Sequence, residues 1–163
     1  MIKVMCQTGQ EMVIDALSLK TAVFDDVELH RAILENEDLA GVSFKRANLR
    51  GALFNNSILT DSNFDAAKLM TASFCDSKLM RASFVGAGLM AAKFDGADLR
   101  NADFESADVG YASFQGADIR GAKLKCSRLE DADLAGVLWD ASTVFPEDFR
   151  GCGRDGSHTA KGS

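Results

Sequence analysis

The sequence predicts an all-β fold, a four-sided parallel β-helix of about six coils. Two observations lead to this prediction. Every fifth residue from Leu19 to Trp139 is large and apolar, without an insertion, and a small residue usually stands two positions before it. A period of five forms no single stripe on an α-helix, and an ordinary strand needs a period of two. The spacing of two, then three, therefore indicates a short extended segment followed by a corner, repeated as a solenoid.

The first element is an N-terminal β-hairpin, expected within residues 1–16. Two apolar runs, Ile2–Cys6 and Glu11–Ile14, flank the polar segment Gln7–Gln10. Such a pattern is typical of two strands joined by a tight turn. The open end of a solenoid exposes its core and unpaired backbone groups, so we expect this hairpin to cap the first coil.

The second element is the β-helix itself, expected over residues 17–142. Its large apolar residue alternates between leucine and phenylalanine over much of the chain. A coil of fifteen residues would place each phenylalanine over a leucine. A coil of twenty residues places phenylalanine over phenylalanine and leucine over leucine. Rings about 4.8 Å apart favour offset aromatic packing, so we predict four sides. Two opposite columns then form the structural core: Phe44, Phe64, Phe84 and Phe104 in one, and Phe54, Phe74, Phe94 and Phe114 in the other.

The repeat ends in a short C-terminal cap, expected over residues 143–150. This stretch holds the only proline, Pro146, and offers Phe145 and Phe149 as a lid over the last coil. Residues 151–163 are rich in glycine and serine, and we expect a flexible tail there.

Composition excludes several classes of function. The chain has 18 basic and 24 acidic residues and a net charge of −6, which argues against direct binding to nucleic acid or to an anionic membrane. Its four cysteines and two histidines show no metal-ligand spacing, and no phosphate-binding loop or nucleophile motif is present. We therefore expect no enzyme activity, metal or cofactor. The lack of a signal peptide or membrane-length apolar run predicts a cytoplasmic protein with reduced thiols.

The repeat resembles the pentapeptide-repeat family, whose motif is A(D/N)Lxx. Ala47-Asn48-Leu49, Ala97-Asp98-Leu99 and Ala117-Asp118-Ile119 match it closely, and Thr143–Phe149 is similar to a terminal TxFPxxF of some bacterial members. The resemblance implies a right-handed quadrilateral β-helix. Most members of that family have no known activity. One branch mimics DNA and binds bacterial type II topoisomerases, which confers quinolone resistance.

The charge density argues against the DNA-mimic function. About six coils make a rod of about 30 Å, and duplex DNA of that length carries about 18 negative charges. The chain carries a net −6, and its acidic C-terminal half is diluted by Arg100, Arg120, Lys123 and Lys125. We therefore predict a non-enzymatic rigid scaffold for protein–protein interaction, with the topoisomerase-binding DNA mimic as the alternative.

A candidate interaction patch consists of Met70, Met90, Ala91 and Tyr111. Residues just after the large apolar position should point outward, yet they include Met70, Met80, Val85 and Met90. Met70 and Met90 are twenty residues apart and so share one column, beside a second column with Ala91 and Tyr111. Exposed apolar surface with methionine suits binding of a protein partner or formation of a homodimer, through this patch or a capped end. The alternative is that these side chains lie flat along the surface and bind nothing.

Three further residues have ordinary interpretations. Glu37 falls in a small inward position, where an unpaired carboxylate is costly, so we expect it to be paired or turned outward. Cys75 should face outward and Cys126 should lie at a corner, both as unreactive thiols.

Overall fold

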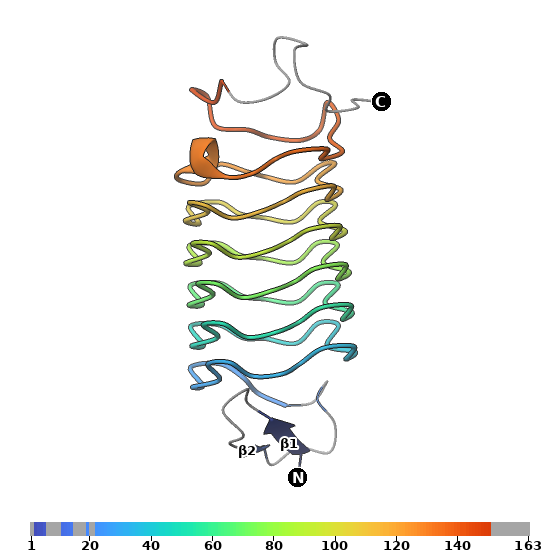
Figure 1. Cartoon of the computed structure of the whole chain (residues 1–163), viewed down its shortest axis with the longest axis vertical. Helices are drawn as coiled ribbons and strands as arrows, with labels where there is room; N and C mark the ends of the chain where they lie inside the picture. The colour runs from blue at the N-terminus through green and yellow to red at the C-terminus, as the bar shows by residue number, and fades with distance from the viewer. Residues whose placement is uncertain (1, 6–10, 15–18, 20–21, 151–163) are drawn as a thin grey trace.

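The structure is a computed structural model that describes residues 2–5, 11–14, 19 and 22–150. Figure 1 shows a straight stack of coils, with strands β1 (Ile2–Met5) and β2 (Glu11–Ile14) beside its N-terminal end. The 3-10 helix η2 (Leu129–Asp131) lies near the other end. Most of the described chain between them consists of turns joined by isolated β-bridges, which makes the fold an all-β solenoid.

Parallel bridges set the size of the coil. The residue before each large apolar residue pairs with the residue twenty positions later, from Glu28 with Asn48 to Asp103 with Lys123. Such bridges start every five residues, so each coil has four sides. Each side pairs through a single residue and not through the short strand expected, because the chain turns again after the large apolar residue.

The corners are turns with a left-handed residue. The second residue after each large apolar residue from Phe24 to Ile119 has a positive φ, as in Gly41 (+72°) and Tyr111 (+59°). The N–H of Ala47 then donates to the carbonyl oxygen of Phe44 at 3.1 Å, which closes the turn. A positive φ at the third residue of a turn is the mark of type II geometry.

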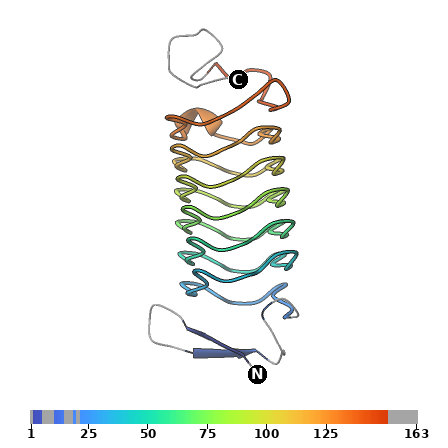
Figure 2. The same ribbon diagram turned by 90° about the vertical axis from the view of Figure 1, so that its right-hand side faces the viewer.

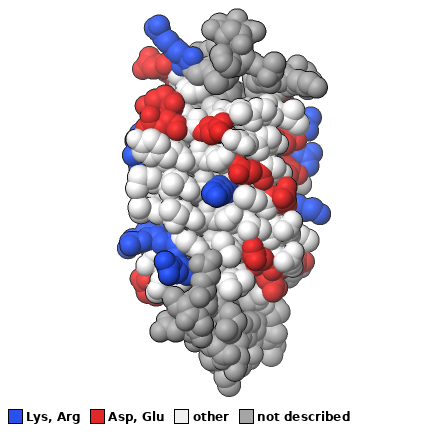
Figure 3. Space-filling view, in the orientation of Figure 1, with Lys and Arg blue, Asp and Glu red and all other residues white. Residues whose placement is uncertain are grey.

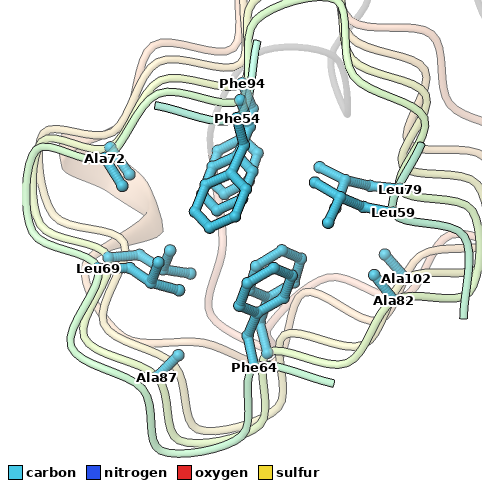
Figure 4. Packing of buried hydrophobic residues seen from close by; sticks show 14 of the residues in the cluster. Phe54, Leu59, Phe64, Leu69, Ala72, Leu79, Ala82, Ala87, Phe94 and Ala102 are labelled. Carbon is cyan, nitrogen blue, oxygen red and sulfur yellow. The ribbon is translucent and has the colours of Figure 1, made fainter. Parts of the chain in front are cut away.

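Phenylalanine fills the interior, as predicted. All eight predicted core phenylalanines, together with Phe24, are fully buried. Successive rings within a column stack at 4.8–5.0 Å, and rings of the two opposite columns meet edge to face at 5.5–5.8 Å. Figure 4 looks down the coils and shows Phe54 and Phe94 on one side of the interior facing Phe64, with leucines between them on the other two sides. Both contacts are favoured ring geometries.

Glu37 turns outward, one of the two outcomes expected for it. The Glu37 side chain is exposed. The hydroxyl of Ser57, from the next coil, forms hydrogen bonds with backbone groups at this position. Ser57 Oγ donates to the Leu34 carbonyl oxygen at 2.7 Å and accepts the N–H of Glu37 at 3.1 Å. A buried serine thus satisfies two backbone groups.

Two paired strands lie where the N-terminal hairpin is expected. β1 and β2 pair antiparallel, with Ile2 opposite Ile14 and Met5 opposite Glu11. Figure 2 shows the two strands beneath the first coil. The predicted turn at Gln7–Gln10 lies outside the described residues, and the capping role stays a prediction.

The regular lattice ends earlier than the sequence period indicates. Asp108 pairs with Ser127, nineteen residues on, and Lys123 pairs with Val144, twenty-one residues on. A left-handed Arg128 (φ +59°) and η2 replace the regular corner between them. The spacing of twenty is thus broken at Ser127 and Val144, although it is kept between them, where Ser113 pairs with Asp133 and Asp118 with Leu138. One consequence is that Cys126 packs against the core instead of occupying a regular corner.

Three aromatic side chains gather at the C-terminal end. Phe145 meets Trp139 edge to face at 5.8 Å and stacks on Phe149 at 5.3 Å. Phe149 is buried, whereas Trp139 and Phe145 are half-buried. Their role as a lid stays a prediction, and the predicted tail at residues 151–163 lies outside the described residues.

Candidate protein-interaction surface

The four residues of the predicted patch lie on one corner of the solenoid. We call this corner, which follows the buried residues Leu69, Leu89 and Val109, the Met–Tyr corner. Met70 and Met90 are its first residues on successive coils, and Ala91 and Tyr111 are its second. The Thr71 N–H donates to the Met90 carbonyl oxygen at 2.9 Å, so the two methionine positions are stacked one coil apart.

The exposure of these side chains is uneven. Tyr111 is 67% exposed and Met70 36%, whereas Met90 and Ala91 are half-buried. Tyr111 also has a left-handed backbone (φ +59°), a conformation that is uncommon for a bulky residue. The corner therefore presents an exposed tyrosine ring beside two methionine side chains that are less exposed.

The other outward apolar residues do not join this surface. Met80 is half-buried on the corner after Leu79, and Val85 is exposed on the corner after Phe84. Further exposed apolar side chains belong to other sides of the coil: Val23, Ile33, Ile58, Leu138 and Val144. The patch is thus limited to the Met–Tyr corner.

The Met–Tyr corner continues toward the N-terminal end into a basic hollow that we did not predict. His30, Arg31 and Arg50 line a hollow of about 590 Å³, together with Glu28, Asn48, Gly51 and Thr71. Gly51 is left-handed (φ +67°), and a Cβ there would touch the Arg31 side chain at 3.4 Å. Neither arginine forms an ion pair with another described residue. Following the column of Met70 down by twenty residues would have identified both Arg50 and His30.

The same corner becomes acidic at its other end. Glu130 and Asp131 of η2 are exposed. Between them and the methionines lies Gly110, where a Cβ would overlap the Arg128 guanidinium. That guanidinium is paired with Asp108. On the left side of Figure 3, red atoms in the upper half and blue atoms in the lower half border a largely white stretch.

The diagonally opposite corner is covered by ion pairs instead. We call this corner, which follows Leu59, Leu79, Leu99 and Ile119, the paired corner. Arg81 bridges to Asp61 on the coil below at 2.7 Å, and Arg100 and Arg120 fold back onto Asp98 and Asp118 at 2.6 Å. The hydrogen bond from Arg120 lowers the pKa of Asp118, and the bond from Arg100 does the same for the pKa of Asp98.

Ion pairs bind four acidic side chains in the acidic half of the chain. In addition to Asp98 and Asp118, Asp103 pairs with Lys123 at 2.8 Å, and Asp108 pairs with Arg128. An acid bound to a neighbouring cation contributes little to a negative field. Cations within this half thus lie directly on four of its acidic side chains.

The cysteine and metal predictions concern groups outside this corner. Burial raises the pKa of the Cys126 thiol to about 12, so it is a poor nucleophile at neutral pH. Cys126 lines an apolar hollow of about 520 Å³ with Leu129, Pro146 and Phe149. Cys75 is half-buried and lies 3.4 Å from the Ser73 hydroxyl. Within the described part of the chain, histidine, cysteine and acidic residues form no cluster suited to a metal ion, and no helix is long and apolar enough to cross a membrane.

Comparison with known proteins identifies the repeat. Two family models match, one described as a pentapeptide repeat region over residues 57–134 and one as pentapeptide repeats over residues 22–61 and 38–74. No curated protein matches the chain.

Among solved structures, one similar protein shares the fold. HetL of the cyanobacterium Nostoc sp. strain PCC 7120, a pentapeptide repeat protein involved in heterocyst differentiation regulation, is 26% identical, with a TM-score of 0.57 over 72% of this chain and 56% of HetL. A pentapeptide repeat protein of the Arabidopsis thaliana thylakoid lumen is 28% identical over 71% of this chain and 72% of its own, with a TM-score of 0.46. QnrB1, a plasmid-mediated fluoroquinolone resistance protein, is 19% identical over 71% of this chain and 70% of its own, with a TM-score of 0.40. From the family matches and the repeat geometry together, the chain belongs to the pentapeptide-repeat family.

Proposed function

We propose that this protein is a non-enzymatic, rigid scaffold that binds a protein partner through the Met–Tyr corner. One observation carries the proposal: Met70, Met90, Ala91 and Tyr111 gather on one corner, where Tyr111 and Met70 are exposed. A right-handed winding, about six coils, a cap at each end and a cytoplasmic location belong to the same proposal.

The physical basis is a contrast between two corners: the Met–Tyr corner leaves apolar side chains exposed to water, whereas ion pairs cover the paired corner. Apolar side chains exposed together gain free energy when a partner removes them from water, by about 25 cal/mol per Å². Methionine adapts to the shape of its partner, and tyrosine adds a hydroxyl that can form a hydrogen bond. The coils beneath are held by the stacked phenylalanine columns, so the surface is presented without reorganisation of the backbone.

One similar protein has a regulatory role. HetL is described as involved in heterocyst differentiation regulation. The aligned region covers 56% of HetL, so only the shared solenoid is compared. The alternative, a topoisomerase-binding DNA mimic, is disfavoured because four of the acidic side chains it would display are paired with lysine or arginine. Inhibition of gyrase supercoiling at low protein concentration would revive it.

The experiment is capture of partners from an extract of the cells that make the protein. The immobilised wild-type chain is compared with Met70→Lys/Met90→Lys, which places two charges on the Met–Tyr corner. The matched control, Met80→Lys/Val85→Lys, adds the same charges at outward apolar positions elsewhere. We expect the first variant to lose a partner that the wild type and control retain. Equal capture by all three proteins, or equal loss from both variants, would contradict the proposal.

A further inference from the structure

We infer that the partner of the Met–Tyr corner is a second copy of this chain, packed side by side in the antiparallel direction. The inference rests on the proposed function of that corner and names its partner. It starts from the order of side chains along the corner, which runs from basic through apolar to acidic.

A two-fold axis that is perpendicular to the solenoid and crosses the middle of the corner pairs each position of one copy with a position of the other. The first residues of the corner, stacked one coil apart, are His30, Arg50, Met70, Met90 and Gly110, and η2 with Glu130 and Asp131 replaces the next turn of this corner. An axis midway between Met70 and Met90 places each methionine against the other methionine of the second copy. The same axis brings the basic hollow, with His30 and Arg31, to the level of η2, with Glu130 and Asp131, on the second copy.

Charge complementarity favours this orientation over a parallel one. Arg31 and Arg50 are exposed and unpaired among the described residues, while Glu130 and Asp131 are exposed at the other end. Glu28, which binds Asn48, offsets part of the basic charge. At the other end the Arg128 guanidinium, which lies over Gly110, is paired with Asp108, so Glu130 and Asp131 leave that end acidic. In a parallel pair like charges would meet at both ends, which is repulsive. In the antiparallel pair opposite charges meet twice, because a two-fold interface repeats every contact.

Shape complementarity points to the same alignment. The axis places Tyr111, the most exposed aromatic residue of the described chain, opposite Gly51 of the second copy. Gly51 lies in the basic hollow, where the missing side chain leaves space between Arg31 and Thr71. A tyrosine ring entering this hollow would lie beside the Arg31 guanidinium, and cations are attracted to the face of an aromatic ring. Both copies make this contact.

The size of the contact predicts a weak dimer. From Arg31 to Asp131 the corner spans five coils, about 24 Å. A single corner buries much less than the about 800 Å² per partner of a standard interface. We therefore expect a concentration-dependent dimer with a Kd of about 10–100 μM that weakens as salt is added.

Sedimentation of the full chain tests this arrangement through a charge swap. Arg31→Asp and Asp131→Arg should each raise the dimer Kd by at least about tenfold. The double variant Arg31→Asp/Asp131→Arg restores opposite charges across the axis, so its dimer should recover. Arg81→Asp is the matched control, because it makes the same charge change on the paired corner and should leave self-association unchanged. Circular dichroism confirms that each variant is folded.

The outcomes separate this inference from the proposed function. A wild-type chain that stays monomeric at about 0.5 mM, or a charge swap without rescue, overturns the antiparallel dimer. If Met70→Lys/Met90→Lys nevertheless loses a captured protein, the partner is a different protein and the proposed function stands. A dimer that Arg81→Asp disrupts as strongly as Arg31→Asp also contradicts the inference.

Discussion

The Met–Tyr corner and the paired corner lie diagonally across the same coils and share their backbone. Both contain a left-handed residue, Tyr111 (φ +59°) on one and Arg81 (φ +59°) on the other. Both cover a column of buried leucine or similar residues. Their outer chemistry differs, since one corner satisfies its charges internally and the other leaves apolar side chains in water. The inner residues therefore set the fold, and departures from the repeat on the outside indicate function.

The largest expected effect comes from the interior that both corners share. Phe74→Ala removes one ring from a stacked column and leaves a cavity, so we expect unfolding to become easier by about 3–5 kcal/mol. The measurement is urea denaturation. Phe74→Leu, which fills much of the space, should cost less. A loss below about 1 kcal/mol for Phe74→Ala would show that the columns do not hold the coils together.

A smaller effect follows from making the paired corner apolar. Arg120→Met removes the cation that lowers the pKa of Asp118. A carboxylate with a lowered folded pKa stabilises the protein above its ordinary pKa, near 3.8, and this stabilisation is lost as pH falls through the folded value. We expect Arg120→Met to lower the free energy of unfolding at pH 7 by much less than Phe74→Ala does, because solvent screens the pair.

Acidification checks the origin of that loss. At pH 2 the difference between wild type and Arg120→Met should shrink, because protonation of Asp118 weakens the pair in the wild type as well. Denaturation at pH 7 and pH 2 measures both values. A difference that does not depend on pH would mean that Arg120 acts through packing and not through its charge.

The smallest expected effect, of opposite sign, is at Tyr111. Tyr111→Gly removes a bulky side chain from a left-handed position, which should stabilise the chain by about 0.5 kcal/mol while weakening self-association. Thermal denaturation and sedimentation measure the two effects. Arg81→Gly has the same φ on the paired corner but loses the ion pair with Asp61, so its gain should be smaller. Destabilisation by Tyr111→Gly would mean that the ring packs on its own coil.

Sequence reasoning predicted the interior well because sterics there leave few choices. A period of twenty forces like residues into one column, and the stacking of Phe64 on Phe84 at 5.0 Å follows directly. The outward turn of Glu37 depended on Ser57 from the next coil, a contact that no local pattern reveals. The register change at Ser127 was equally hidden, since the period of five continues in the sequence through η2.

The positions that form the candidate surface could be predicted in part. Four patch residues could be found because spacing by twenty places them together, but the charged ends of their corner require the whole column to be followed. The hollow at Gly51 depends on the conformation of the Arg31 side chain, which the sequence does not determine. The arrangement of the buried residues can therefore be predicted from the sequence, whereas the shape of the outer surface cannot.

Site-specific photo-cross-linking tests the claim that contacts form at the Met–Tyr corner most directly. A photoactivatable residue replaces Met90 in one protein and Met80, on the paired corner, in another. Irradiation in an extract of the native cells should give adducts from position 90, either with a second copy or with another protein, and few from position 80. Adducts of equal yield at both positions, or none at position 90, would contradict the account.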